Sequence, residues 1–297
     1  DQVRPAAFDL MINEVESQTQ HAENGNILRL TATAPSQFVE TLEVGEIDNL
    51  KFSSLGTTSK NIEIWLPTSA IVEIAEVGAT SEIIAAPFDS RKRWLHYGSS
   101  ISQSIEADRP MDAWVLRAAQ LLNLNITNFG LAGQCQLDGF VARSMAALPA
   151  DMITLKIGIN IVNADSMRER AFIPAVHNFL DILREGASDT PIIIISAIWC
   201  PFHEDIPGPT MIDGATLFGK ERPEEFAAGA LTLQRTRELL QEVVIKRSDK
   251  NIHFMDGLML FGAADQDNLP DKLHPNSAGY RLMADRFAKA QRALMSL

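Results

Sequence analysis

The sequence Arg93–Ser102, RWLHYGSSIS, joins an apolar run typical of a buried strand to a turn of glycine and serine residues. A serine just beyond such a strand lies where ligands bind in an open α/β sheet, in the crevice past the carboxyl ends of the strands. Gly98 allows the chain to turn sharply there and brings backbone N–H groups close to a substrate. Because Gly-Ser-Ser is also a common polar turn, a chemical role for this stretch depends on a second motif elsewhere in the chain.

That second motif is Asp271–Pro275, DKLHP, at the mouth of the last predicted helix. Asp271 precedes His274 by three residues, so one turn of backbone can hold the two side chains together. A hydroxyl, an imidazole and a carboxylate form the arrangement that serine hydrolysis requires. The sequence therefore predicts Ser100 as the nucleophile, His274 as its base and Asp271 as the group that orients the imidazole.

Other serines in the same stretch are alternative nucleophiles: Ser99, Ser102 and Ser104. The alignment with Gly98 favours Ser100 over all three. The motif is not Gly-x-Ser-x-Gly, because Ser102 stands where the last glycine would be, and this argues against the nucleophile elbow of the α/β-hydrolases.

The chain from residue 91 to 297 alternates short apolar runs with stretches of helical period. The predicted strands are residues 94–97, 126–129, 153–157, 192–198 and 252–255. The predicted helices are residues 111–122, 137–148, 168–184, 223–246 and 275–294. Strands that alternate with helices predict a parallel sheet covered on both faces, which is an α/β fold.

Residues 1–90 have a different pattern. Apolar and polar residues alternate over 8–14 and 28–33, with the turn signal Asn24-Gly25 between them, and the alternation continues over 62–66 and 72–74. This predicts a small antiparallel β-sandwich-type domain, joined by the linker 87–92 to the α/β domain. We expect it to pack against the second domain or to lend one wall to a cleft.

The composition excludes several classes of function. With 46% hydrophobic residues the chain can bury a substantial core, and its formal net charge of -12 makes nucleic acid and anionic membranes poor partners. No apolar run approaches the length of a membrane-spanning helix. We expect a cytoplasmic protein, with a removed signal peptide as the open alternative because the chain begins at Asp1.

Two cysteines, Cys135 and Cys200, are too few for a disulfide framework or a four-thiolate zinc site. Two buried thiols are favoured over a disulfide between them. The long segment 199–222 has no periodicity and is expected to form a lid or a pocket wall. Within it, His203-Glu204-Asp205 is predicted to be a solvated loop face rather than a metal site. The remaining histidines considered are His96, expected in the core or behind the site, and His177 and His253, expected to be structural.

Two more stretches follow predicted strands, Asn128–Gln134 and Gly158–Asn160. Ester hydrolysis passes through a tetrahedral oxyanion that needs fixed donors, and the loss of one donor costs about 2.7 to 4 kcal/mol. The N–H of Gly133 and the side-chain amide of Asn160 are suitable donors. Each also has a purely structural explanation, as a tight turn and as a loop-capping amide.

With these four blocks in order, the sequence resembles the SGNH hydrolases, also called the GDSL esterase/lipase family. The block Gly98–Ile101 is similar to the family's Gly-Asp-Ser-Leu block. The resemblance implies an oxyanion hole made by the N–H groups of Ser100 and Gly133 and the amide of Asn160, and a triad completed by an Asp-x-x-His block at 271–274.

The resemblance covers about residues 94–297 and implies a flavodoxin-like three-layer α/β/α fold with strand order 2-1-3-4-5. An N-terminal β-sandwich looks like the arrangement in some carbohydrate-deacetylating members. Ser99 and Ile161 stand where the family usually has aspartates, a departure that affects the shape of the pocket more than the chemistry.

These observations predict a serine esterase that removes a short acyl group, expected to be acetyl, from a carbohydrate or small metabolite through an acyl-enzyme. No metal or organic cofactor is expected. Trp199 and Ser99 are the predicted substrate contacts. Alternatives are an acyltransferase, a lipase or thioesterase of the same fold, and a carbohydrate-binding protein with a lapsed triad. The sequence leaves the oligomeric state open.

Overall fold

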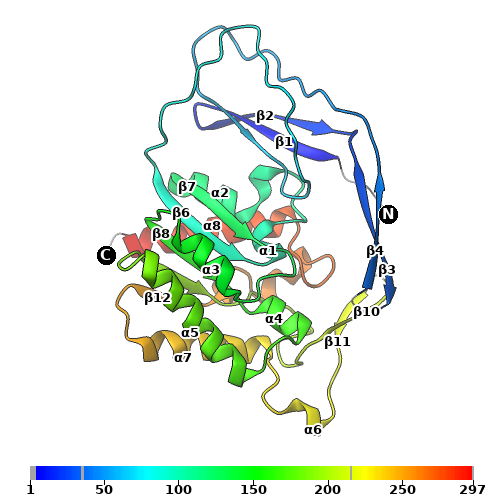
Figure 1. Ribbon diagram of the computed structural model, residues 1–297, viewed down its shortest axis with the longest axis vertical. Helices are drawn as coiled ribbons and strands as arrows, with labels where there is room; N and C mark the ends of the chain where they lie inside the picture. Colours follow the sequence, from blue (N-terminus) through cyan, green and yellow to red (C-terminus); the bar gives the residue numbers. More distant parts are fainter. Residues whose placement is uncertain (1–4, 35–36, 215, 296–297) are drawn as a thin grey trace. The chain divides into compact units, whose positions relative to one another are not determined.

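The computed structural model describes residues 5–34, 37–214 and 216–295 (Figure 1). The chain divides into two compact units, of which the first holds residues 1–87 with 108–111 and the second holds residues 88–107 with 112–297. The domain boundary expected near residue 90 stays a prediction. Each unit is described by itself.

The second unit is built on a five-stranded parallel sheet (Figure 1). Its strands are β6 (Lys92–Gly98), β7 (Leu124–Gly130), β8 (Met152–Lys156), β9 (Ile192–Ile195) and β12 (Ile252–Met255). They lie in the order β12-β9-β8-β6-β7, which is the order 2-1-3-4-5 that the family resemblance implies. The central strands are almost fully buried because helices cover both faces, as in other parallel sheets.

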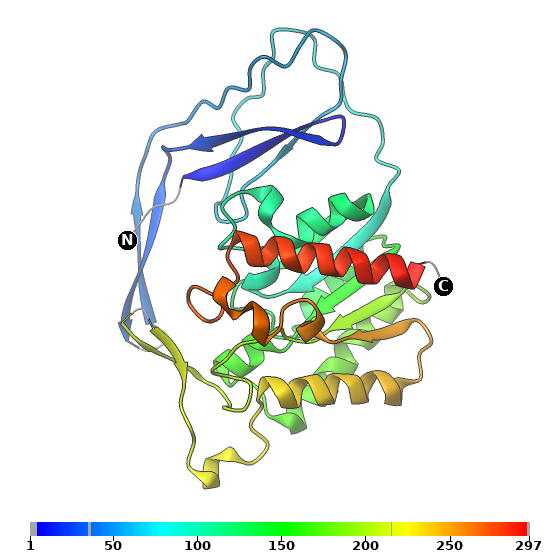
Figure 2. The same ribbon diagram turned by 180° about the vertical axis from the view of Figure 1, so that it is seen from behind.

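Helices form the outer two layers. One face carries α2 (Trp114–Leu122) packed on α8 (Ser277–Met295), and Figure 2 shows α8 lying in front of the sheet. The other layer holds α3 (Gly139–Ala146), α5 (Glu169–Gly186) and α7 (Leu233–Arg247), with α5 in contact with both of the others. Two short helices, α1 (Ser100–Gln103) and α4 (Ile159–Ala164), follow β6 and β8 directly. The predicted α/β fold is confirmed.

Three predicted elements differ in extent. The helix expected over 223–246 is divided into α6 (Glu224–Ala227) and α7, because Gly229 adopts a left-handed φ of 69° and the Thr232 side chain caps a new helix. The helix expected from residue 111 begins at Trp114, after the 3-10 turn η1 (Pro110–Asp112). The strand expected over 192–198 ends at Ile195.

The segment expected to be an aperiodic loop, 199–222, contains a hairpin. Strands β10 (Thr210–Asp213) and β11 (Thr216–Gly219) pair in antiparallel register within it. Two 3-10 helices, η2 (Gly257–Met259) and η3 (Ala263–Asn268), lead from β12 towards α8.

The first unit contains antiparallel strands, as predicted, in two separate sheets. One has the order β2-β1-β5, from β1 (Ala6–Ile12), β2 (Val15–Ala22) and β5 (Ile62–Trp65). The other pairs β3 (Ile27–Ala34) with β4 (Gln37–Glu43). Packing of these sheets as a sandwich stays a prediction.

Two local expectations for this unit are wrong. The strand predicted to reach residue 14 ends at Ile12, because Asn13 and Glu14 have φ values of 50° and 67° and form a tight turn into β2. The alternation over 72–74 forms no strand, since residues 66–91 carry none in the described structure.

The buried carboxylate of Asp9 organises the first unit. Its Oδ1 accepts a hydrogen bond from the Thr19 hydroxyl at 2.6 Å, and its Oδ2 accepts one from the Met111 backbone N–H at 2.8 Å. Arg109 also donates to Asp9 Oδ1, at 3.4 Å, and to Glu16. These bonds explain why residues 108–111 belong to the first unit although they lie between two parts of the second.

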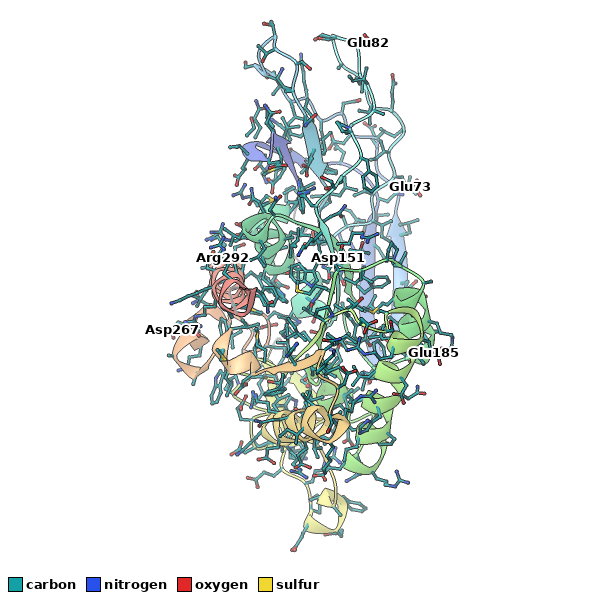
Figure 3. All side chains as sticks on the ribbon, turned by 90° about the vertical axis from the view of Figure 1, so that its left-hand side faces the viewer. Glu73, Glu82, Asp151, Glu185, Asp267 and Arg292 are labelled. Atoms are coloured by element: carbon teal, nitrogen blue, oxygen red, sulfur yellow. The ribbon has the colours of Figure 1, made fainter. Side chains whose placement is uncertain are left out.

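Many charged residues lie at the surface, whereas Asp9, Lys156 and Arg237 are buried. Figure 3 shows the side chains of Asp151, Glu185 and Asp267 on the outside of the second unit, and all three residues are exposed. No helix among the described residues is both long and apolar enough to cross a membrane.

Candidate active site

The nucleophile candidate lies on the first turn after β6. Ser99 caps α1, because its hydroxyl accepts a hydrogen bond from the Ile101 N–H at 3.2 Å. Ser100 is therefore the first helical residue, with 7% of its surface exposed. A Cβ on Gly98 would overlap the Ser102 hydroxyl, so only glycine allows α1 to fold back this closely on the strand.

The three residues assigned to the triad are joined by two consecutive hydrogen bonds. The Oγ of Ser100 is 2.8 Å from Nε2 of His274, and Nδ1 of His274 is 2.6 Å from Oδ2 of Asp271. A base held between a nucleophile and an orienting carboxylate is the geometry of nucleophilic catalysis. Residues 174 positions apart are thus brought together at the carboxyl end of the sheet.

The carboxylate of Asp271 is held ionised by its hydrogen bonds. Burial alone would raise its pKa, but the bond from His274, together with backbone N–H donors of His274 and Leu273 at 2.7 and 2.9 Å, keeps the pKa below its usual range. Lys272 adopts a left-handed φ of 65° in this turn. The short Asp-x-x-His turn therefore delivers an ionised acceptor to the imidazole.

The oxyanion candidates lie on two neighbouring loops. Gly133 follows β7 with a left-handed φ of 71°, and Asn160 is in the first turn of α4. The Cys135 N–H donates to the Asn160 Oδ1 at 3.0 Å. Because this bond holds the carbonyl side of the amide, the N–H side is directed elsewhere. The oxyanion role of Gly133 and Asn160 stays a prediction.

Gln136, which no sequence motif singles out, connects these loops. Its Nε2 donates to the carbonyl of Asn160 at 3.1 Å and to that of Gly133 at 3.4 Å. Its Oε1 accepts from the Ser166 hydroxyl at 2.6 Å. A glutamine next to a cysteine in a loop carries no sequence signal of this role, because the contacts depend on how two distant loops meet.

The two predicted substrate contacts differ in position. Ser99 is fully buried and its hydroxyl caps α1, which gives it a structural role and argues against direct contact with a substrate. Trp199 is half-buried against the core, and its backbone N–H donates to the Phe261 carbonyl at 3.1 Å. Trp199 as a substrate contact stays a prediction.

The expectation that His203-Glu204-Asp205 is a solvated face is wrong for its first two residues. His203 is fully buried, with Nδ1 2.9 Å from the Ile206 carbonyl and Nε2 2.8 Å from the Thr210 hydroxyl. Glu204 forms a bidentate ion pair with Arg237 at 2.7 and 2.8 Å. The polar side chains turn inwards because they satisfy the backbone of a long loop.

Arg237 also fixes the start of this loop. Its guanidinium donates to the carbonyl of Ala197 at 3.1 Å and to that of Ile198 at 3.3 Å. Trp199 therefore directly follows two residues whose carbonyls are anchored by Arg237, and it precedes Glu204, which forms an ion pair with the same arginine.

Both cysteines are buried free thiols, as expected. Burial raises the pKa of each to about 12, so neither is a ready nucleophile. His96 is fully buried, as predicted, and His177 and His253 lie on α5 and β12. Among the described residues no three or more His, Cys, Asp or Glu residues gather as a group that could hold a metal ion.

A cavity of about 420 Å³ lies beside the Asp271 turn. It is lined by Pro201, Gln266, Asp267, Leu269, Pro270 and Lys272. Its walls thus combine apolar surface with an amide, a carboxylate and an ammonium group.

Solved structures similar to this chain include an acyltransferase, a putative lipase and a carbohydrate esterase. The salicylyl-acyltransferase SsfX3 from a tetracycline biosynthetic pathway is 26% identical, with a TM-score of 0.69 over 100% of this chain and 76% of that chain. A putative GDSL-like lipase from Bacteroides ovatus is 22% identical, with a TM-score of 0.61 over 99% of this chain and 82% of that one.

A family two carbohydrate esterase from Clostridium thermocellum, in complex with cellohexaose, is 12% identical, with a TM-score of 0.59 over 99% of this chain and 87% of that one. The last two likenesses concern the fold alone. No curated protein matches the chain. The model of the GDSL-like lipase/acylhydrolase family matches residues 96–282, more than half of the sequence and all the blocks described above. The chain therefore belongs to the GDSL-like lipase/acylhydrolase family.

Proposed function

We propose that this protein is a serine carboxylic-ester hydrolase that removes short acyl groups through an acyl-enzyme. The observation that carries the proposal is the continuous hydrogen-bonded chain from Ser100 Oγ through His274 to Asp271, with distances of 2.8 and 2.6 Å. Membership of a lipase and acylhydrolase family supports the same class of reaction.

In the first step His274 takes the proton of Ser100 while Oγ attacks the ester carbonyl. Asp271 keeps the other ring nitrogen protonated, so that Nε2 is the acceptor. The tetrahedral intermediate expels its alcohol, which receives the proton from His274. Water then attacks the acyl-enzyme by the same route and releases the carboxylic acid.

The oxyanion of each intermediate would accept hydrogen bonds from the backbone N–H groups of Ser100 and Gly133 and from the Asn160 amide. Support for this assignment comes from the bond that the Cys135 N–H makes to Asn160 Oδ1, because it leaves the amide nitrogen as the free side. Donors fixed before the reaction cost no reorganisation when the charge develops.

For the substrate we propose an acetyl ester of a carbohydrate or small metabolite. The cavity beside Asp271 has a mixed apolar and polar lining, which suits a polyhydroxy alcohol better than a long acyl chain. Trp199, which is partly buried against the core and precedes Pro201 of this lining by two residues, is the proposed contact for a sugar ring.

A second candidate is transfer of the acyl group to an acceptor alcohol. The similarity to a salicylyl-acyltransferase favours it, because that likeness extends over 100% of this chain, including the N-terminal unit. Both candidates share the acyl-enzyme and differ only in whether water or an alcohol attacks it.

The decisive variant is Ser100→Ala, assayed with 4-nitrophenyl acetate. We expect kcat to fall by about 10³-fold or more, because the covalent route is lost. Ser144→Ala, on the exposed surface of α3, is the matched control and should keep full activity. Wild-type turnover by the Ser100→Ala protein would overturn the proposal.

A ladder of esters from acetyl to octanoyl, with and without an acceptor sugar, separates the candidates. Hydrolysis requires free acid as the main product. The proposed acetyl specificity requires the highest kcat/KM for the acetyl ester. Transfer requires a new ester of the acceptor to form at the expense of free acid.

A further inference from the structure

Two serines on the single turn of α1 each bond a histidine. Ser100 Oγ is 2.8 Å from His274 Nε2, and Ser102 Oγ is 2.7 Å from His96 Nε2. Residues two apart on an α-helix point in directions that differ by roughly 200°. The hydroxyls therefore leave the helix on nearly opposite sides, one into the candidate site and one into the interior.

The inner pair extends into a longer buried chain. Nδ1 of His96 is 2.5 Å from the Thr154 hydroxyl, which also accepts a bond from Nε1 of Trp94 at 2.8 Å. An indole nitrogen can only donate. We assign the hydrogen bonds so that the Thr154 hydroxyl donates to Nδ1 of His96, and Nε2–H of His96 donates to Ser102 Oγ. Every donor in the chain from Trp94 to Ser102 then points the same way along it.

This inner pair is not a second catalytic pair. His96 and Ser102 are both fully buried, and no carboxylate bonds the imidazole. Burial, with a smaller contribution from the nearby Lys156 ammonium, lowers the pKa of His96 to about 3. The imidazole therefore stays neutral over the working range and keeps one tautomer.

Helix α1 depends on such contacts for its orientation. It has four residues, too few to be stable alone. Gly98 and Gly130 leave no room around it, since a Cβ on either would overlap the backbone or side chain of residues 102–103. The Asn128 amide donates to the Ser102 carbonyl at 2.9 Å. Among these contacts, the His96 bond is the one that holds the Ser102 side chain itself.

We propose that His96 is a positioning residue, which acts through Ser102 to fix the rotation of α1 about its axis and so holds the Ser100 hydroxyl at His274. The proposal rests on ester hydrolysis at Ser100. It assigns a function to a buried hydrogen-bonded chain that takes no part in the proposed chemical steps.

The test uses the full chain with Ser102→Ala, Thr154→Val, His96→Phe and His96→Gln, measuring kcat, KM and the midpoint of thermal unfolding. We expect Ser102→Ala and His96→Phe to lower kcat about 10- to 100-fold with KM changed less than about twofold, because misplaced reacting groups lose rate rather than binding. His96→Gln retains an N–H donor near the position of Nε2 and should recover most of the rate. His253→Phe, on β12 of the same sheet, is the matched control.

The double variant Ser102→Ala with His96→Phe should lose no more kcat than either single variant, because both remove one interaction. Wild-type kcat in Ser102→Ala overturns the proposal, even if the unfolding midpoint falls, since the bond would then be structural only. A rise in KM at unchanged kcat also overturns it. If His96→Phe does not fold, Ser102→Ala and Thr154→Val decide by the same criteria. Activity that survives Ser100→Ala refutes the proposed function instead.

Discussion

At the scale of single residues, the proposed catalysis depends on the loops that carry Gly133 and Asn160 as well as on the residues assigned to the triad. Gln136 is the clearest case, because one amide binds the carbonyls of Gly133 and Asn160 at once. We expect Gln136→Leu to lower kcat about tenfold with little change in KM, since the candidate oxyanion donors would lose their fixed separation. Steady-state kinetics on 4-nitrophenyl acetate measure this. The exposed Gln241→Leu on α7 is the control, and an unchanged kcat in Gln136→Leu would refute the prediction.

Lys156 is a buried amine that opposes folding. Its side chain is fully buried and its Nζ has no hydrogen-bond partner among the described residues. Burial lowers its pKa to about 8, with Cys135 opposing and Arg237 adding to the effect. Because the unfolded chain binds this proton more tightly, the free energy of unfolding should rise as pH increases from about 8 to the ordinary lysine value of about 10.4.

Lys156→Met is therefore expected to stabilise the protein at pH 7 by about 1 to 3 kcal/mol, as a similar volume replaces an unpaired amine. The gain should shrink at pH 10. Urea unfolding at both pH values measures it. If Lys156→Met is less stable than the wild type at pH 7, the prediction is wrong and the buried ammonium stabilises the folded state.

At the scale of elements, the five parallel strands could be predicted because they are short apolar runs, most completely buried in β8 and β9. Periodicity missed β2 (VESQTQHA) and the loop strands β10 and β11, whose residues are largely exposed and carry no apolar alternation. Such strands form because a partner supplies their hydrogen bonds, and that information is not local. The residues assigned to the triad could be singled out from the sequence because they lie in short motifs, and their catalytic roles stay a prediction. Gln136 and the His96 chain could not, because they join separate loops and strands.

The division of the helix predicted over 223–246 gives a test at this scale. Thr232 Oγ1 accepts from the Arg235 N–H at 3.0 Å and starts α7. Thr232→Ala should lower the free energy of unfolding by about 1 kcal/mol, because a helix N–H loses its partner. Chemical denaturation measures the change. No loss of stability would mean that α7 begins elsewhere.

At the scale of the whole molecule, Asp9 joins the N-terminal strands to residues 108–111. Asp9→Ala should lower the free energy of unfolding by about 1.5 to 3 kcal/mol, because hydrogen bonds to a buried carboxylate are lost. Glu40→Ala, on the exposed surface of β4, is the control in the same denaturation experiment. Equal stability of the two variants would contradict the prediction.

The hydrogen bond between Asp9 and Met111 also affects what an N-terminal truncation of the protein would do. A polypeptide that starts at Phe88 would still contain residues 108–111 but would lack Asp9, whose carboxylate accepts the hydrogen bond of the Met111 N–H. Such a truncation would also remove the Asp9 and Glu16 carboxylates that Arg109 contacts, in a loop only a few positions after Ser100. We expect the shortened product to aggregate in expression trials, so that a catalytic fragment would need this loop redesigned as well as the leading strands removed.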